Sequence, residues 1–86
     1  MGEYSVNFAR SARKELESLP NTQIVRVFRR IERLMKEPRP VGCTKLRGSS
    51  DLWRIRVGNY RVIYSVNDAD KIIDITAIRH RSQAYD

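Results

Sequence analysis

The feature that most constrains this chain is a pair of alternating segments separated by two residues. Residues 53–57 and 60–66 each place an apolar side chain at every second position, and only Gly58-Asn59 lies between them. A two-residue connection that begins with glycine predicts a β-hairpin closed by a type II′ turn. In the resulting register Arg56 lies directly opposite Arg61.

This register sorts the hairpin side chains onto two faces of a sheet. One face is apolar and suited to cover a core, and it carries Trp53, Ile55, Val57, Tyr60, Val62 and Tyr64. The other face carries Arg54, Arg56, Arg61 and Ile63. Because directly opposed like charges destabilise a sheet, we interpret the arginine face as an anion site, where a phosphate would accept bidentate hydrogen bonds. The alternative is a solvated face whose arginines splay apart in water.

The overall charge agrees with a polyanionic partner. The chain has 17 Lys and Arg against 10 Asp and Glu, a formal charge of +7 and an isoelectric point near 10.2. Nucleic acid is the first candidate, although charge alone also fits a merely soluble basic domain. With 86 residues the chain is long enough for one domain and too short for two. We therefore expect a single domain over residues 1–86.

The N-terminal half has the apolar spacing of two helices. Ser11 is expected to cap a short first helix that Pro20 ends, and Asn21 begins a second helix that stops before Pro38. The second helix has an apolar stripe made of Ile24, Val27, Phe28, Ile31, Leu34 and Met35. Its arginines, Arg26, Arg29, Arg30 and Arg33, lie mostly outside that stripe.

Strands complete the predicted fold. Residues 3–8 alternate as a first strand, a short strand is expected near residues 45–47, and a last strand over residues 71–78 follows the hairpin. We predict an α+β fold of order β-α-α-β-β-β-β. Its N-terminal helix hairpin packs on a small twisted antiparallel sheet.

The C-terminal segment holds further groups suited to chemistry. It reads Arg79-His80-Arg81, with Tyr85 close behind, and His80 is the only histidine of the chain. Two flanking arginines disfavour the charged imidazolium, which would leave a neutral base able to accept a proton. Tyr85 could supply a phenol for proton transfer in RNA cleavage, or it could stack on an unpaired base. The alternative is a tyrosine that packs against the sheet edge.

Strand alternation predicts where this segment points. Continuing the period from Ile75 puts Ala77 and Arg79 on the core side and His80 on the polar side. Arg81 reaches the polar face only if the strand has ended, so we expect an irregular chain after Arg79.

Cysteine content and hydropathy exclude several classes of protein. The single Cys43 cannot form an internal disulfide, and no spacing of Cys or His offers a metal site. No stretch approaches the ~20 apolar residues of a membrane span. We expect a soluble cytoplasmic protein that uses no metal and no small-molecule cofactor and is not associated with a membrane.

The whole chain resembles the RelE/ParE toxin superfamily, in motifs as well as in order of elements. The motifs are the first helix at residues 11–20, Lys45-Leu46-Arg47-Gly48, the hairpin at residues 53–64, and His80-Arg81 ahead of Tyr85. The resemblance implies a RelE-like, microbial RNase-like fold and a type II toxin-antitoxin module. It also implies an endoribonuclease that inhibits translation by cutting A-site messenger RNA on the ribosome without metal. The product would be a 2′,3′-cyclic phosphate, and a cognate RelB-like antitoxin would hold the toxin inactive.

The resemblance also assigns site residues. The basic residues of the family fall at Arg54 and Arg56 in the third strand, at Arg61 in the fourth, and at Arg81 and Tyr85 near the C-terminus. The best-known RelE proteins carry lysines in the third strand, where this chain carries arginines. Because arginine stays protonated, it serves poorly as a general base. We therefore hypothesise that His80 or Tyr85 takes the proton.

The other assigned roles are electrostatic. Arg54, Arg56 and Arg61 hold and polarise the phosphate, and Arg81 is the partner of the leaving oxygen. Lys45, Arg47 and Arg79 are assigned to RNA binding. Two alternatives share these features: a ParE-like inhibitor of DNA gyrase, and a non-catalytic RNA-binding module. The convergent phosphate site favours the nuclease.

Overall fold

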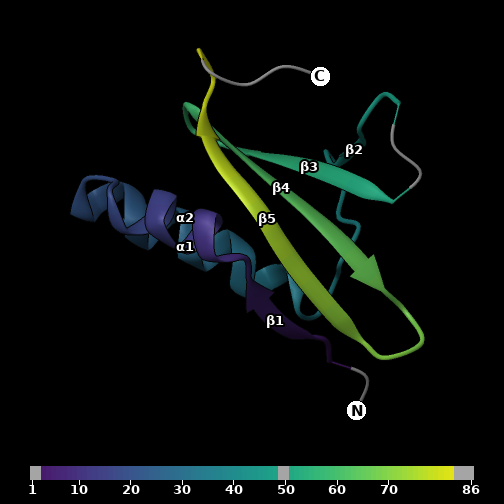
Figure 1. The fold of residues 1–86 in the computed structure, drawn as a ribbon. Coiled ribbons are helices and arrows are strands. Elements are labelled where there is room, and N and C mark those ends of the chain that lie inside the picture. Colours follow the sequence, from purple (N-terminus) through teal and green to yellow (C-terminus); the bar gives the residue numbers. More distant parts are fainter. Residues whose placement is uncertain (1–2, 49–50, 83–86) are drawn as a thin grey trace.

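The computed structural model describes residues 3–48 and 51–82 (Figure 1). Its elements are β1 (Ser5–Phe8), α1 (Arg10–Glu17), α2 (Asn21–Leu34), β2 (Thr44–Lys45), β3 (Leu52–Val57), β4 (Tyr60–Asn67) and β5 (Ile72–His80). The strands of these residues form one sheet in the order β1-β5-β4-β3-β2. The predicted α+β class and element order are confirmed.

The sheet is mixed, which corrects the expectation of an antiparallel sheet. Strands β2 to β5 pair antiparallel, but β1 pairs parallel with β5, where Val6 lies opposite Ile73. Because β1 and β5 run the same way, the chain leaves Phe8 toward the C-terminal end of β5. Helix α1 begins directly afterwards and lies against that end. This arrangement brings the N-terminal helix to the last part of β5, where Glu15 of α1 contacts Ile78 and Arg79; Figure 1 shows the helices beside β5.

The hairpin register is confirmed residue by residue. Arg56 pairs with Arg61, Ile55 with Val62, Arg54 with Ile63, and Trp53 with Tyr64. Gly58, the first residue of the turn, has a φ of 60°, which the type II′ turn requires and glycine tolerates best.

The apolar face of the hairpin meets the helices in one core. Buried side chains of α1 and α2 pack with those of β3, β4 and β5; they are Ala12, Leu16, Val27, Ile31, Leu34, Ile55, Val57, Val62, Tyr64, Ile73, Ile75 and Ile78. Phe28 departs from the predicted stripe, because its side chain is 45% exposed. Burial raises the pKa of the Tyr64 phenol, which stays protonated and donates to the Pro38 carbonyl oxygen at 2.7 Å.

Three predicted boundaries differ from the structure. Ser11 lies inside α1, whose N-cap is Ala9, so the predicted serine cap is wrong. Strand β2 is limited to Thr44–Lys45, and the predicted strand residues 46–47 lie beyond it. Strand β5 continues through His80 because its N–H and C=O groups keep pairing with β4.

Strand β5 also contains a β-bulge that the alternation does not reveal. Tyr64 pairs with Ile75 and Ile63 pairs with Ala77, so Thr76 is an extra residue without a partner in the register. Its hydroxyl donates to the Ile63 carbonyl oxygen at 3.1 Å. An extra residue reverses the face of every side chain that follows.

The bulge makes the predicted facing of the C-terminal segment wrong. Ala77 and Arg79 pair with Ile63 and Arg61 and therefore lie on the arginine face. His80 pairs with Tyr60 and lies on the side covered by the helices.

A polar cluster fastens the opposite end of the sheet. The Tyr4 hydroxyl donates to Asp68 Oδ1 at 2.7 Å, and Arg39 donates to both Asp68 oxygens at 3.2 and 2.9 Å. The Arg39 guanidinium also lies 5.3 Å from the centroid of the Trp53 ring. Asp68 thus joins the segment before β1, the segment after α2 and the β4–β5 turn.

This cluster predicts an acid-sensitive contribution to stability. Hydrogen bonds from Arg39 and then Tyr4 lower the pKa of Asp68. A lowered folded-state pKa gives stability that is present above the unfolded pKa and lost as pH falls through the folded pKa. Asp68→Asn should therefore be less stable than wild type at neutral pH, with the difference shrinking in acid. Urea unfolding at several pH values measures this difference in stability. Asp74→Asn, at an exposed position on β5, is the control. A difference that does not change with pH would contradict the role given to Asp68.

The helices are also short relative to a lipid bilayer. Within the described residues, no helix is long and apolar enough to span a membrane.

Candidate active site

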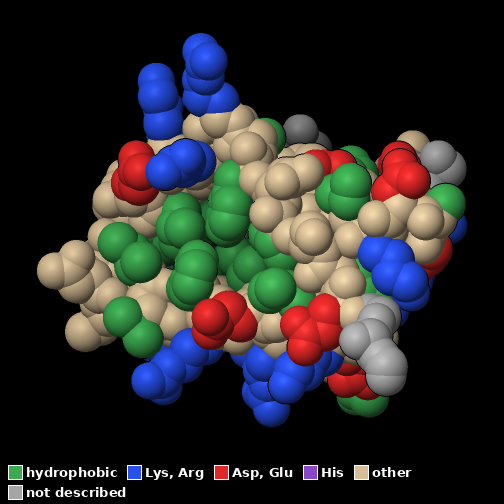
Figure 2. Space-filling view, turned by 90° about the horizontal axis from the view of Figure 1, so that it is seen from below, with side chains coloured by type: hydrophobic (Ala, Val, Ile, Leu, Met, Phe, Trp, Pro, Cys, Tyr) green, Lys and Arg blue, Asp and Glu red, His purple; other side chains and the backbone are tan. Residues whose placement is uncertain are grey.

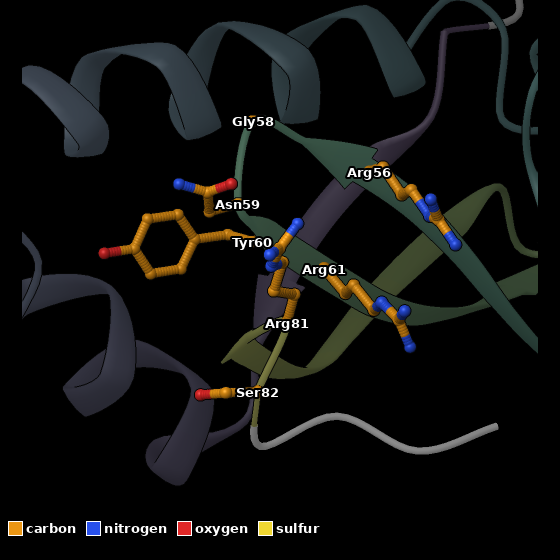
Figure 3. Close-up of a pocket in the computed structure, with 7 residues that line it drawn as sticks. All are labelled: Arg56, Gly58, Asn59, Tyr60, Arg61, Arg81 and Ser82. Carbon is orange, nitrogen blue, oxygen red and sulfur yellow. The ribbon is translucent and has the colours of Figure 1, made fainter.

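A pocket of about 480 Å³ opens at the tip of the β3–β4 hairpin. It is lined by Arg56, Gly58, Asn59, Tyr60, Arg61, Arg81 and Ser82 (Figure 3). Among the described residues that line it, three are arginines and none is an aspartate or glutamate. The pocket is therefore suited to an anion.

Arg56 and Arg61 enter the pocket from neighbouring strands. They are a directly opposed pair, and Figure 3 shows their side chains extending in the same direction. Arg56 is exposed and Arg61 is half-buried. Two guanidinium groups held side by side can hold two oxygens of one phosphate through bidentate hydrogen bonds.

Arg81 reaches the same pocket because β5 stays attached to the hairpin beyond its last strand residue. The Arg81 backbone N–H donates to the Asn59 carbonyl oxygen at 2.7 Å. Alternation from Arg79 puts the Arg81 side chain on the arginine face. The strand ends at His80, one residue later than expected, and residues 81–82 form a turn. Because of the bulge at Thr76, Arg81 is on the same face as Arg61 and lies near it (Figure 3).

Arg79 is turned away from the pocket by a carboxylate. It lies opposite Arg61 in the register, but its Nε donates to Glu15 Oε2 of α1 at 2.8 Å. The other oxygen, Glu15 Oε1, accepts the Ile78 backbone N–H at 2.8 Å. Glu15 therefore covers an edge of β5 that β1, which ends opposite Ile75, does not reach.

The other predicted basic residues lie outside the pocket. Arg54 is on the arginine face, between Ile63 and Thr44, but is only 8% exposed. Lys45 pairs with Trp53 on the opposite face, with its Nζ 5.9 Å from the Trp53 ring centroid. Arg47 is exposed in the turn after β2.

His80 stands beside the pocket on the helix-covered side of the sheet. Its ring packs edge to face on Tyr60, with centroids 5.4 Å apart. Its Nδ1 accepts the Ser82 backbone N–H at 3.2 Å and lies 2.9 Å from Ser82 Oγ. This acceptor is therefore engaged in holding the segment that carries Arg81. Tyr85 lies outside the described residues.

Comparison with known proteins identifies the family. The family model described as the ParE toxin of the type II toxin-antitoxin system, parDE, matches residues 6–85. This chain belongs to the RelE/ParE toxin superfamily. Within the RelE/ParE superfamily it is 33% identical to the RelE1 protein of Methanocaldococcus jannaschii, over 96% of both chains. It is 30% identical to the toxin RelG of Mycobacterium tuberculosis, over 95% of both.

Solved RelE structures show the same fold. A chain of the archaeal RelE-RelB complex from Pyrococcus horikoshii is 39% identical, with a TM-score of 0.82. The match covers 98% of this chain and 100% of that one. The resemblance seen in the sequence motifs is therefore confirmed at the level of the RelE/ParE superfamily.

Four residues that line the pocket at the hairpin tip were not predicted from the sequence. They are Gly58, Asn59, Tyr60 and Ser82. The two turn residues could have been found, because the predicted hairpin places them next to Arg61. The position of Ser82 had no sequence signal, since it depends on the bulge at Thr76.

Proposed function

We propose that this toxin is a ribosome-dependent endoribonuclease that inhibits translation by cutting messenger RNA in the A site. In the proposed reaction the 2′-oxygen bonds to phosphorus as it loses its proton, and the bond to the 5′-oxygen breaks as that oxygen gains one. The products are a 2′,3′-cyclic phosphate and a 5′-hydroxyl, and no metal is used. The main support is the convergence of Arg56, Arg61 and Arg81 on one pocket.

The arginines would act on the phosphate rather than as bases. Arg56 and Arg61 hold its non-bridging oxygens and stabilise the charge that develops in the transition state. Arg81, at the other side of the pocket, faces the leaving oxygen. Arg54 is buried beside this group and, in our proposal, supports the face without touching RNA.

The proton acceptor must be another residue, because arginine stays protonated. His80 has its Nδ1 engaged by Ser82 and lies on the other side of the sheet from Arg61. We therefore assign His80 to positioning Arg81, and retain Tyr85 as the candidate base.

Substitutions of His80 test that assignment. His80→Asn, whose amide oxygen can replace Nδ1 as acceptor, should keep nearly the wild-type rate. His80→Leu loses the hydrogen bond and should slow cleavage by about tenfold, equal to ~1.4 kcal/mol. Single-turnover cleavage on programmed ribosomes measures both. A loss of about 10²- to 10⁴-fold in both variants would instead make His80 the general base.

One paired assay tests the function itself. Purified protein is added to translating ribosomes and, separately, to a DNA gyrase supercoiling reaction. We expect codon-positioned cuts in the message and unchanged supercoiling. Gyrase inhibition with intact message would favour the second candidate, a gyrase inhibitor, which is considered because the matching family model is described as ParE. RNA binding with neither effect would leave a non-catalytic module.

We also propose a cytoplasmic, single-domain toxin that a RelB-like antitoxin holds inactive. The relative from Pyrococcus horikoshii was solved as a RelE-RelB complex. This chain offers a hollow of about 430 Å³ on its helix side, lined by Phe8, Arg13, Leu16, Glu17, Ile24 and Phe28. Figure 2 shows hydrophobic side chains gathered on that side, with both basic and acidic side chains at the margins. An acidic amphipathic helix fits such a surface, and an affinity independent of salt would contradict the electrostatic part.

A further inference from the structure

Helix α2 carries a row of arginines that the proposed reaction does not use. Arg26, Arg29, Arg30 and Arg33 follow the i, i+3, i+4, i+7 spacing, which puts them on one face of the helix. Like charges at these spacings destabilise a helix. Within the described residues, the ion pairs involve Arg13, Arg39 and Arg79, so none of them neutralises this row. The helix therefore maintains an unfavourable concentration of charge.

The row is continuous with the pocket. Arg30 Nη1 donates to the backbone carbonyl oxygen of Arg56 at 3.2 Å. The Arg26 guanidinium lies against the turn, so close that a Cβ built on Gly58 would be 3.3 Å from its Nη1. Figure 3 shows a helix running beside the Gly58 end of the hairpin. A polyanionic strand that leaves the pocket past Gly58 would therefore reach α2 next.

The outer part of the row forms a basic surface of its own. A hollow of about 520 Å³ is lined by Arg29, Arg30, Glu32, Arg33 and Lys36. At 1.5 Å per residue, Arg26 to Arg33 extends for about 10 Å along α2, and Lys36 follows just beyond Leu34, where the helix ends. We define Arg26, Arg29, Arg30, Arg33 and Lys36 as the α2 strip.

We infer that the α2 strip binds the phosphodiester backbone of the RNA strand whose scissile phosphate occupies the pocket. The inference rests on the proposed function for the identity of that strand. Arginines offer phosphate a planar fork of donors. Because the α2 strip contacts the hairpin turn at Gly58, a single RNA strand could lie across both the pocket and the strip. Such contacts hold and align the strand and leave the chemistry to the pocket.

The test removes two charges of the strip that do not contact the hairpin. The variant is Arg29→Gln/Arg33→Gln, and the matched control is Arg10→Gln/Lys14→Gln on α1, whose side chains are also exposed. The probe is a short fluorescent single-stranded RNA with a 2′-deoxy nucleotide at the cleaved position, so that binding is measured without turnover. Its Kd is followed by anisotropy between about 50 and 200 mM salt.

We expect the strip variant to bind more weakly and with less salt dependence. Two lost phosphate contacts should reduce the slope of log affinity against log salt by about 1.4, whereas the control keeps the wild-type slope. On programmed ribosomes the strip variant should show a raised KM and an unchanged kcat. Equal slopes for the two variants would overturn the inference. The inference would also be overturned if the strip variant lost affinity only for ribosomes, which would point to ribosomal RNA. It would likewise be overturned if affinity were lost only for an acidic antitoxin peptide, which would point to the antitoxin.

The result also separates this inference from the proposed function. If the wild type binds the probe through the strip but leaves ribosomal message intact, the strip stands and the nuclease assignment fails. If the wild type cuts message and the strip variant binds like its control, the nuclease stands and the strip fails.

Discussion

Arg61→Ala should lower the single-turnover rate of message cleavage on programmed ribosomes by about 10²- to 10³-fold, the usual effect of removing one donor to the developing charge. Arg61 lies at the centre of the arginine face, between Arg56 on β3 and Arg79 on β5. It also lines the pocket together with Arg81. Without Arg61, no arginine of β4 would hold the phosphate in the pocket. The phosphate would then be poorly aligned with the leaving oxygen.

Two other variants make this result specific. Arg61→Lys keeps the charge but loses the planar fork of donors, so its rate should fall between those of wild type and Arg61→Ala. Lys14→Ala removes one charge from an exposed position on α1, outside the pocket, and should cut nearly as fast as wild type. A wild-type rate for a correctly folded Arg61→Ala protein would exclude Arg61 from the phosphate site.

Glu15→Ala should reduce the free energy of unfolding by about 2 to 3 kcal/mol. The substitution leaves the Ile78 backbone N–H without its acceptor, and Ile78 is only 3% exposed; an unsatisfied buried group costs about 1–3 kcal/mol. It also removes the partner of Arg79, a partly exposed pair worth less than about 1 kcal/mol. Thermal unfolding should show a Tm lower by about 10 to 20 °C.

Glu17→Ala is the matched control on the same helix. Glu17 pairs with Arg13 at 3.5 Å, and both side chains are well exposed, so its loss should change stability little. Glu15→Gln keeps an oxygen for the Ile78 N–H and should fall between wild type and Glu15→Ala. Equal effects of Glu15→Ala and Glu17→Ala would contradict the role given to the β5 edge.

The hairpin was predictable because its determinants are local. Gly58-Asn59 sets the turn, the turn sets the register, and the register places Arg56 opposite Arg61. The second helix was predictable for a similar reason, since an apolar stripe and flanking prolines define it within a short segment. The arginine face followed from these local rules before the family was considered.

The features that escaped prediction depend on contacts between distant segments. The parallel pairing of β1 with β5 joins the two ends of the chain, and no local pattern encodes it. From the sequence, Glu15 is one of two glutamates on α1, and only the position of β5 beside it distinguishes it from Glu17. The pairing of Arg54 with Thr44 of β2 likewise joins segments that no local pattern connects.

The site was therefore predictable in its centre and not at its margins. Arg56, Arg61 and Arg81 come together as expected. His80 and Arg79 do not, because one side chain is on the other face and the other is held by Glu15. The alternation rule failed for both at a single residue, Thr76.

Thr76 has a consequence for how relatives of this toxin are aligned. Because the bulge accommodates one residue beyond the regular pairing, a homologue that lacks a residue at this point can form an unbroken strand and still present its later side chains on the same faces. A one-residue gap opposite Thr76 would thus leave the equivalents of Arg79 and Arg81 in place. A homologue of full length without the bulge would instead exchange them with its equivalent of His80. The pairing of β5 with β4, rather than a count of residues along the chain, therefore decides which arginine of a relative belongs in the pocket.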